Sequence, residues 1–82
     1  MYIHIGGEKI LRTSEIIAIF DIEIDHSSKI SKQFLQHAKE NKDVDFISEE
    51  EAKSIIVTKQ KVIYSPISSS TLKKRTHYIS DL

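Results

Sequence analysis

The amino-acid sequence predicts a small α+β domain, residues 1–82, with short antiparallel β-hairpins, one main helix and a short C-terminal helix. Three observations support this prediction. The 82 residues are 39% hydrophobic and 29% charged, which is ordinary for one folded domain and too apolar for a disordered chain. Short β-like runs of apolar residues are separated by turn signals. Only one long segment, residues 29–42, has its apolar residues at helical spacing.

The chain begins with a predicted hairpin. Residues 1–5 alternate isoleucine with tyrosine and histidine, and Gly6 and Gly7 then supply a tight turn before a return strand at 9–11. Thr13 and Ser14 follow. Their hydroxyls are expected to cap a single helical turn that ends at residue 15.

The run 16–24, IIAIFDIEI, is the most strand-like part of the first half. One face is predicted to carry Ile16, Ala18, Phe20, Ile22 and Ile24, and the opposite face begins with Ile17 and Ile19. A strand that is apolar on both faces must be covered on both faces. One helix covers one side, so we expect a second layer or another subunit on the other side.

The main helix is predicted over residues 29–42, with Ser28 as a plausible N-cap. Its apolar residues share one helical face: Ile30, Phe34, Leu35 and Ala38. A short strand is expected at 44–47, followed by a solvated acidic turn at 49–51.

A second hairpin is predicted from strands 54–58 and 61–65, joined by a turn at Lys59 and Gln60. Pro66 ends regular pairing because it has no amide to donate. The hydroxyl residues 68–71 offer several caps for a last helix that ends near His77.

Composition excludes several classes of protein. No apolar run approaches the ~20 residues of a membrane helix, and the N-terminus lacks the basic and apolar segments of a signal peptide. We therefore expect a cytoplasmic protein with no membrane partner. The chain has no cysteine, which excludes disulfides and thiolate metal sites.

Catalytic and metal-binding patterns are weak. The four histidines, at positions 4, 26, 37 and 77, share no short metal-ligand spacing. The serine run has no nucleophile elbow and no base at a recognised spacing. The carboxylates of residues 43–51 lie among polar neighbours that would not raise their pKa values. We expect no enzyme activity, no metal and no cofactor.

Charge is balanced in total but not along the chain. Twelve basic and twelve acidic residues cancel, yet six acidic residues and one lysine lie from Glu40 to Glu51, and six basic residues and no acidic residue lie from Lys53 to Arg75. The second segment is suited to an anionic partner such as double-stranded DNA. Its candidate contacts are Lys53, Lys59, Lys61, Ser69, Ser70, Thr71, Lys73, Lys74 and Arg75.

A purely structural explanation of the same residues is also open. One hydroxyl of residues 68–71 can cap the last helix while Lys73, Lys74 and Arg75 interact favourably with its C-terminal carbonyls. Lys59 and Lys61 would then only keep the hairpin tip soluble. Both explanations stand at this point.

Three segments carry a family resemblance: MYIHIG, TSEIIAIFD and SIIVTKQKVIYSPISSSTLKKR. They resemble the RemB (YaaB) proteins, bacterial extracellular-matrix and biofilm regulators related to the RemA family. The resemblance covers almost the whole chain and is strongest over residues 54–75. It implies a regulator of matrix genes and not an enzyme. It also implies a homo-oligomer, because RemA is a DNA-binding transcription activator that assembles into a ring.

The resemblance also places glutamates, Glu15, Glu50 and Glu51, at positions that are basic in the DNA-binding relative. A carboxylate repels phosphate, so two readings follow. In the first, a ring-forming homo-oligomer binds DNA through a repeated basic surface. In the second, an oligomer of the same fold engages another regulatory protein through its acidic surface. For either oligomer, the candidate subunit interface is Ile17, Ile19, Ile56 and Tyr64.

Overall fold

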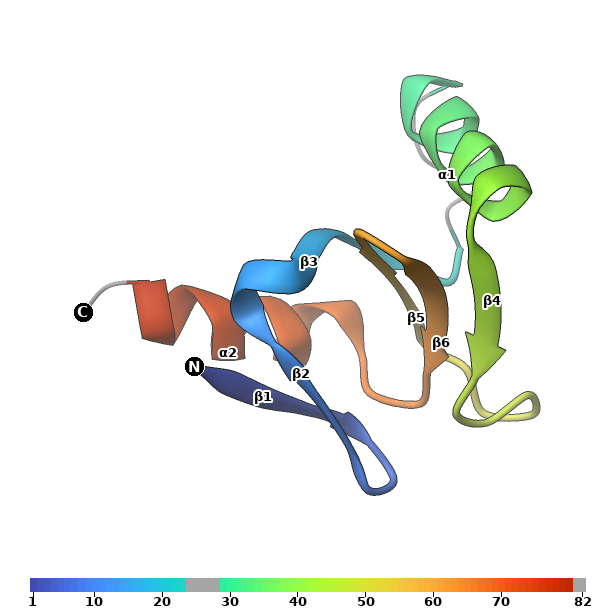
Figure 1. The fold of residues 1–82 in the computed structure, drawn as a ribbon. Helices are drawn as coiled ribbons and strands as arrows, with labels where there is room; N and C mark the ends of the chain where they lie inside the picture. The colour runs from blue at the N-terminus through green and yellow to red at the C-terminus, as the bar shows by residue number, and fades with distance from the viewer. Residues whose placement is uncertain (24–28, 81–82) are drawn as a thin grey trace.

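A β-hairpin opens the chain in the computed structural model, which describes residues 1–23 and 29–80, with side chains through residue 76 (Figure 1). Strands β1 (Tyr2–Gly6) and β2 (Lys9–Arg12) pair antiparallel, as predicted. Gly6 ends β1 opposite Lys9, and Gly7 and Glu8 form the two-residue turn. The φ angles of Gly6 and Gly7 are 122° and 57°, values that favour glycine. The predicted single helical turn is present as a 3₁₀ helix, Thr13–Glu15.

The predicted cap of this 3₁₀ helix is wrong. No side chain caps it, and the Thr13 hydroxyl instead donates to the Met1 carbonyl at 3.4 Å. The backbone N–H of Thr13 donates to the same carbonyl at 3.0 Å. Thr13 therefore ties the end of the hairpin to the start of the chain.

The remaining strands form one four-stranded sheet in the order β3-β5-β6-β4. Its members are β3 (Ile16–Asp21), β5 (Ser54–Thr58), β6 (Lys61–Ser65) and β4 (Asp43–Phe46). The hairpin of β5 and β6 is the predicted one, and β3 adds to it antiparallel. β4 joins parallel to β6, which the prediction of antiparallel hairpins alone had missed. The sheet is therefore mixed. The parallel pairing could not be predicted because a four-residue strand carries no local signal of which strand lies beside it.

Two helices and the hairpin cover the sheet on its two faces (Figure 1). α1 (Lys29–Asn41) covers one face, where Leu35 and Ala38 pack on Ile55, Val57, Val62 and Tyr64. α2 (Ser69–Ser80) and β1 cover the other face, where Leu72, Ile3 and Ile5 pack on Ile56 and Ile63. The second layer expected over β3 therefore comes from the same chain. The small α+β fold with two helices is confirmed.

A bulge in β3 corrects the predicted faces of that strand. The register shifts between Ile16 and Ala18. Ala18 and Phe20 therefore face α1, whereas Ile16 and Ile19 pack on the α2 side. Ile17 is 49% exposed. Simple alternation fails here because a bulge adds one residue to one strand.

The outer half of α1 is also less buried than its spacing predicted. Leu35 and Ala38 are buried, but Phe34 is 40% exposed and Ile30 is 78% exposed. The ring of Phe34 reaches Phe20, with the ring centroids 5.9 Å apart. The helix thus extends beyond the sheet that it covers. The predicted cap, Ser28, lies outside the described residues, as do Ile24 and His26.

Over the described part of the chain, no helix is both long enough and apolar enough to cross a membrane.

Candidate functional site

The basic residues of α2 form the clearest candidate surface. Lys73, Lys74 and Arg75 are exposed and occupy consecutive positions on the helix. Leu72, which is 0% exposed, fixes the same turn of α2 to the sheet. Arg75 Nη1 donates to the carbonyl oxygen of His4 at 2.7 Å, a partner that carries no charge. The three cations are therefore held on a fixed element without a carboxylate to neutralise them in the described part of the chain.

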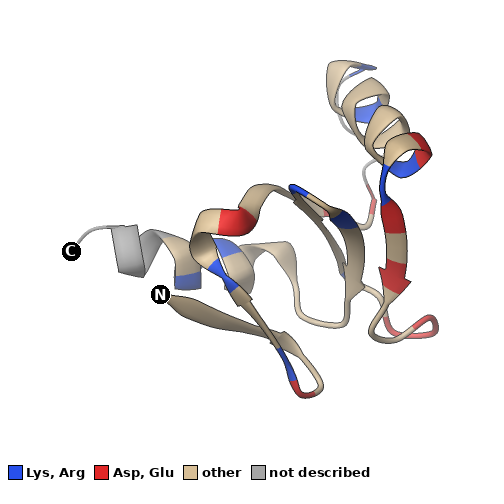
Figure 2. Ribbon diagram, viewed as in Figure 1, with Lys and Arg blue, Asp and Glu red and all other residues tan. Residues whose placement is uncertain are grey.

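Arg12 extends this surface, and sequence reasoning missed it. Its Nε donates to the hydroxyl of Tyr2 at 3.2 Å, and its guanidinium carbon lies 5.6 Å from the centre of the Tyr2 ring. β1 links the two arginines, because Tyr2 holds Arg12 and His4 holds Arg75. Figure 2 shows the basic turns of α2 and the basic end of β2 near the N-terminus. The register of the predicted hairpin places Tyr2 opposite Arg12, and this pairing could have identified Arg12 as a candidate.

The hydroxyl cluster at the start of α2 caps the helix. Ser68 Oγ accepts the backbone N–H of Thr71 at 3.3 Å, the pattern of an N-cap residue, and also donates to Thr71 Oγ1 at 2.9 Å. Ser69 is 9% exposed, and its hydroxyl donates to Asp21 Oδ2 at 3.4 Å. Ser70 is exposed, with its hydroxyl 3.2 Å from that of Ser68. A carboxylate of the protein, Asp21, thus lies where an external anion would have to bind, which favours the structural explanation for these hydroxyls.

The other candidate lysines lie on elements other than α2 and are held by different partners. Lys61 Nζ lies 3.0 Å from Asp45 Oδ2, and the hydrogen bond to Asp45 followed by its charge raises the pKa of Lys61 above its ordinary value. Lys59 is in the turn between β5 and β6, and its backbone N–H donates to the backbone carbonyl of Glu15 at 3.2 Å. Lys53 precedes β5, and its N–H donates to the Ser65 carbonyl. Among the residues described, none of these lysines shares a hydrogen bond or ion pair with α2.

The three glutamates do not form one patch within a subunit. Glu15 lies beside the turn that joins β5 to β6, through its carbonyl contact with Lys59. Glu50 and Glu51 are exposed in the loop between β4 and β5, which leads into the opposite end of β5. That end is anchored by the Lys53 N–H, which lies 2.7 Å from the Ser65 oxygen. A single protein partner could not contact all three glutamates of one subunit through a small patch.

The candidate subunit interface is largely internal. Ile56 is 0% exposed inside the core. Tyr64 is 8% exposed and stacks on Phe46, with ring centroids 4.5 Å apart, under the amine of Lys39 at 5.1 Å. Ile19 is half-buried against the α2 side of the sheet. Of the four predicted residues, Ile17 retains the most surface for another subunit.

An open pocket lies between the β1–β2 hairpin and the sheet. Its volume is about 470 Å³, and its apolar lining includes Ile5, Ile10 and Phe46. The charged pair Lys61 and Asp45 also lines it, and these two groups neutralise each other. Among the side chains that the structure describes, those of residues 1–23 and 29–76, no three His, Asp or Glu residues gather as metal ligands would.

Two comparisons with known proteins bear on this arrangement. The model of the RemA-like family, described as "Extracellular matrix regulatory protein A-like", matches residues 2–76. The chain is also similar to Extracellular matrix regulatory protein B of Bacillus subtilis strain 168. The two are 42% identical over 82 residues, which cover 100% of this chain and 98% of that protein.

Proposed function

The chain belongs to the RemA-like family, and from this premise we propose that it regulates extracellular-matrix genes of biofilm formation as a DNA-binding homo-oligomer. Both descriptions that match it are of matrix regulatory proteins, which supports regulation over catalysis. In this proposal each subunit presents α2 to double-stranded DNA. The oligomer repeats that contact along the duplex.

The unpaired cations of α2 carry the DNA-binding part of the proposal. Lys73 and Lys74 are exposed and have no carboxylate partner among the described residues, whereas Lys61 is neutralised by Asp45. A lysine that already pairs with a carboxylate gains little binding free energy from a DNA phosphate. Unpaired ones release the counterions condensed on DNA, and this release favours binding. Because the chain is neutral overall, the local surface and not the net charge must supply the attraction.

Exposed apolar side chains support the homo-oligomer. A domain of this size buries only about 60% of the surface of its unfolded chain, so few large apolar residues can be left over without cost. Here Ile30, Phe46 and Ile17 are 78%, 49% and 49% exposed, and other large apolar side chains accompany them. Subunit contacts would cover part of this surface. They would also join several weak DNA contacts into one stronger interaction.

The competing proposal is an oligomer that binds a protein partner through Glu15, Glu50 and Glu51 and does not bind DNA. The glutamates support it because they would repel phosphate on any surface that includes them. Glu15 lies at one end of β5, and Glu50 and Glu51 lie at the other end. A compact protein partner would therefore have to contact two different subunits to reach all three glutamates, which weighs against this proposal. We therefore favour the DNA-binding proposal.

Fluorescence anisotropy with duplex DNA at low salt tests the choice. The wild-type protein should bind, and the variant K73A/K74A/R75A should bind at least about tenfold more weakly, because three phosphate contacts are lost. The matched control is K9A/K59A, which removes one exposed lysine from each of the two hairpins and should bind like wild type. No binding by the wild-type protein at low salt would contradict the DNA proposal and favour a protein partner. Circular dichroism confirms that each variant is folded.

A further inference from the structure

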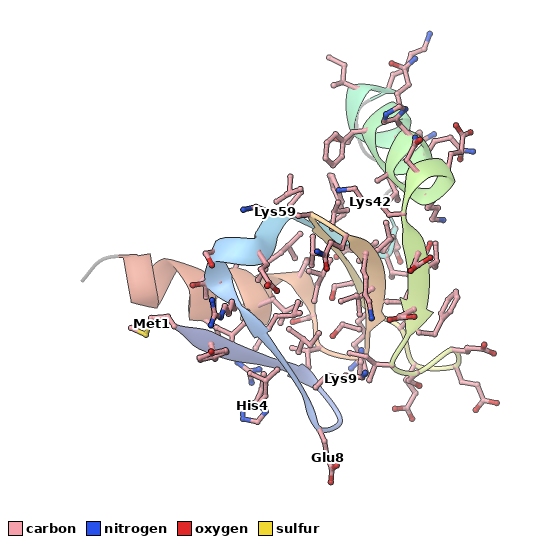
Figure 3. All side chains as sticks on the ribbon, in the orientation of Figure 1. Met1, His4, Glu8, Lys9, Lys42 and Lys59 are labelled. Atoms are coloured by element: carbon pink, nitrogen blue, oxygen red, sulfur yellow. The ribbon has the colours of Figure 1, made fainter. Side chains whose placement is uncertain are left out.

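The side chains of Tyr2 and Arg12 form a pair on the exposed outer face of the β1–β2 hairpin. The two residues lie directly opposite each other in the register of the strands. Ile3 and Ile5 pack inward with α2, and successive residues of a strand point to opposite faces, so Tyr2 points outward. Figure 3 shows His4, on the same face of β1, pointing away from the sheet. Tyr2 is 60% exposed, and Arg12 is exposed as well.

Tyr2 holds one side of the Arg12 guanidinium and leaves the other side free. Arg12 Nε donates to the Tyr2 hydroxyl at 3.2 Å, and Cζ lies 5.6 Å from the centre of the Tyr2 ring, within the range of a cation–π interaction. Among the residues that the structure describes, neither Nη group has a hydrogen-bond partner and no carboxylate pairs with Arg12. The Nη groups are therefore held in place and free to donate.

The two free Nη groups suit the two non-bridging oxygens of a phosphodiester. An arginine can donate to both oxygens at once, whereas a lysine acts on a phosphate only as a point charge. An arginine that already stacks on an aromatic ring also loses less freedom when it binds, because part of its motion is restricted beforehand. The chemistry of the pair thus fits the partner proposed for α2.

Arg12 lies close to the basic residues of α2. Thr13, the next residue, lines the same hollow as Lys73, between β3 and the helix. Arg75 donates to the carbonyl of His4, which is two residues, or about 7 Å, along β1 from the residue opposite Arg12. Each strand of a duplex presents one phosphate per about 3.4 Å of the helix axis. A surface of this length therefore meets more than one phosphate.

We propose that Arg12 binds a phosphate of the same duplex through its two Nη groups and that Tyr2 positions it. The inference rests on the DNA-binding function proposed above and adds a contact from a second element of the subunit. Arg12 lies on the outer face of the hairpin, whereas α2 packs on the inner face. The duplex must therefore cross the end of the hairpin that lies near the N-terminus, where the basic turns of α2 also lie (Figures 1 and 2).

Fluorescence anisotropy over a salt series tests the contact. R12A should flatten the slope of log K against log salt concentration by about 0.9 per bound subunit, because one phosphate contact is lost. R12K keeps the charge, so it should keep the wild-type slope but bind at least about twofold more weakly, because it cannot donate to both oxygens. Each loss should be the same for duplexes of different sequence, since a phosphate carries no base information. The matched control K9A, from the other end of β2, should behave like wild type.

Y2F tests the positioning role, because it removes only the hydroxyl that holds Nε. Alone, it should keep the slope and weaken DNA binding by at least about twofold, the lower limit of coupling between residues in contact. In the R12A background it should change nothing, because its effect acts through Arg12. If the pair only stabilised the hairpin, Y2F and R12A would lower the melting temperature measured by circular dichroism and leave the DNA affinity unchanged.

The results that would overturn the inference differ in what else they remove. If K73A/K74A lowers the slope but R12A does not, or if R12A weakens binding to some DNA sequences only, then Arg12 does not bind a phosphate and the function proposed for α2 stands. An equal effect of Y2F with and without Arg12 would remove the positioning role of Tyr2. If the wild-type protein does not bind duplex DNA at low salt, the proposed function fails as well.

Discussion

Leu72→Ala is the change that best tests how α2 is held. Leu72 is 0% exposed and packs with Ile3, Ile5, Ile56 and Ile63, so it joins α2 to both the hairpin and the sheet. Removing a fully buried leucine side chain costs about 2–5 kcal/mol, and we expect about 3 kcal/mol here. One kcal/mol corresponds to roughly 4–8 °C of Tm in a domain of 60–100 residues. The melting temperature should therefore fall by about 12–24 °C.

Urea and thermal unfolding followed by circular dichroism would measure this loss. The control is Lys74→Ala, on the same helix but exposed, which should change the free energy of unfolding by no more than about 0.5 kcal/mol. A loss below about 1 kcal/mol for Leu72→Ala would refute the packing, because a buried leucine cannot be removed so cheaply from a close-packed core. The basic residues of α2 would then not be held on a fixed surface.

Three further changes test local features. Gly6→Ala should lower the free energy of unfolding by about 1–3 kcal/mol in urea, because φ is +122° and the new Cβ would lie 2.7 Å from the Pro66 ring; an unchanged value would contradict the turn. Ser68→Ala should cost about 1 kcal/mol through loss of the α2 cap, and a neutral result would show that the hydroxyl does not cap. Lys61→Gln should lower Tm slightly at neutral pH. Since Asp45 raises the folded pKa of Lys61 above 10.5, this difference should vanish as the pH rises through that pKa, and a difference that persists would exclude the ion pair as its cause.

Local patterns were enough to predict most elements of the fold. Gly6 and Gly7 marked the first turn because their backbone angles favour glycine. The β-branched run Ile55–Val57 marked a buried strand, and Ser68 was among the caps considered for α2. In each case the physical cause lies within a few residues of the chain, so it can be read from the sequence.

Contacts between distant residues could not be predicted in the same way. The parallel pairing of β4 with β6 joins segments that no local signal connects. The bulge that moves Ile16 to the other face of β3 depends on how β5 pairs with it. Ile30 lies at the helical spacing predicted for a buried residue, but its side chain is exposed because α1 extends past the sheet.

The candidate site shows the same division. The unpaired charge of Lys73 and Lys74 could be inferred from a segment without acidic residues. The neutralisation of Lys61 by Asp45, sixteen residues away in the chain, could not. Arg12 was missed because it joins the α2 surface only through the folded hairpin.

The salt dependence of DNA binding tests the central claim most directly. For duplex DNA, the slope of log K against log salt concentration changes by about 0.9 for each phosphate contact, so K73A/K74A should flatten it by about 1.8 per bound subunit. Between about 50 mM and about 200 mM salt, the wild-type protein should thus lose about twelvefold more affinity per bound subunit than the variant. Equal slopes for the wild-type protein, K73A/K74A and the control K9A/K59A would show that α2 does not contact the phosphates.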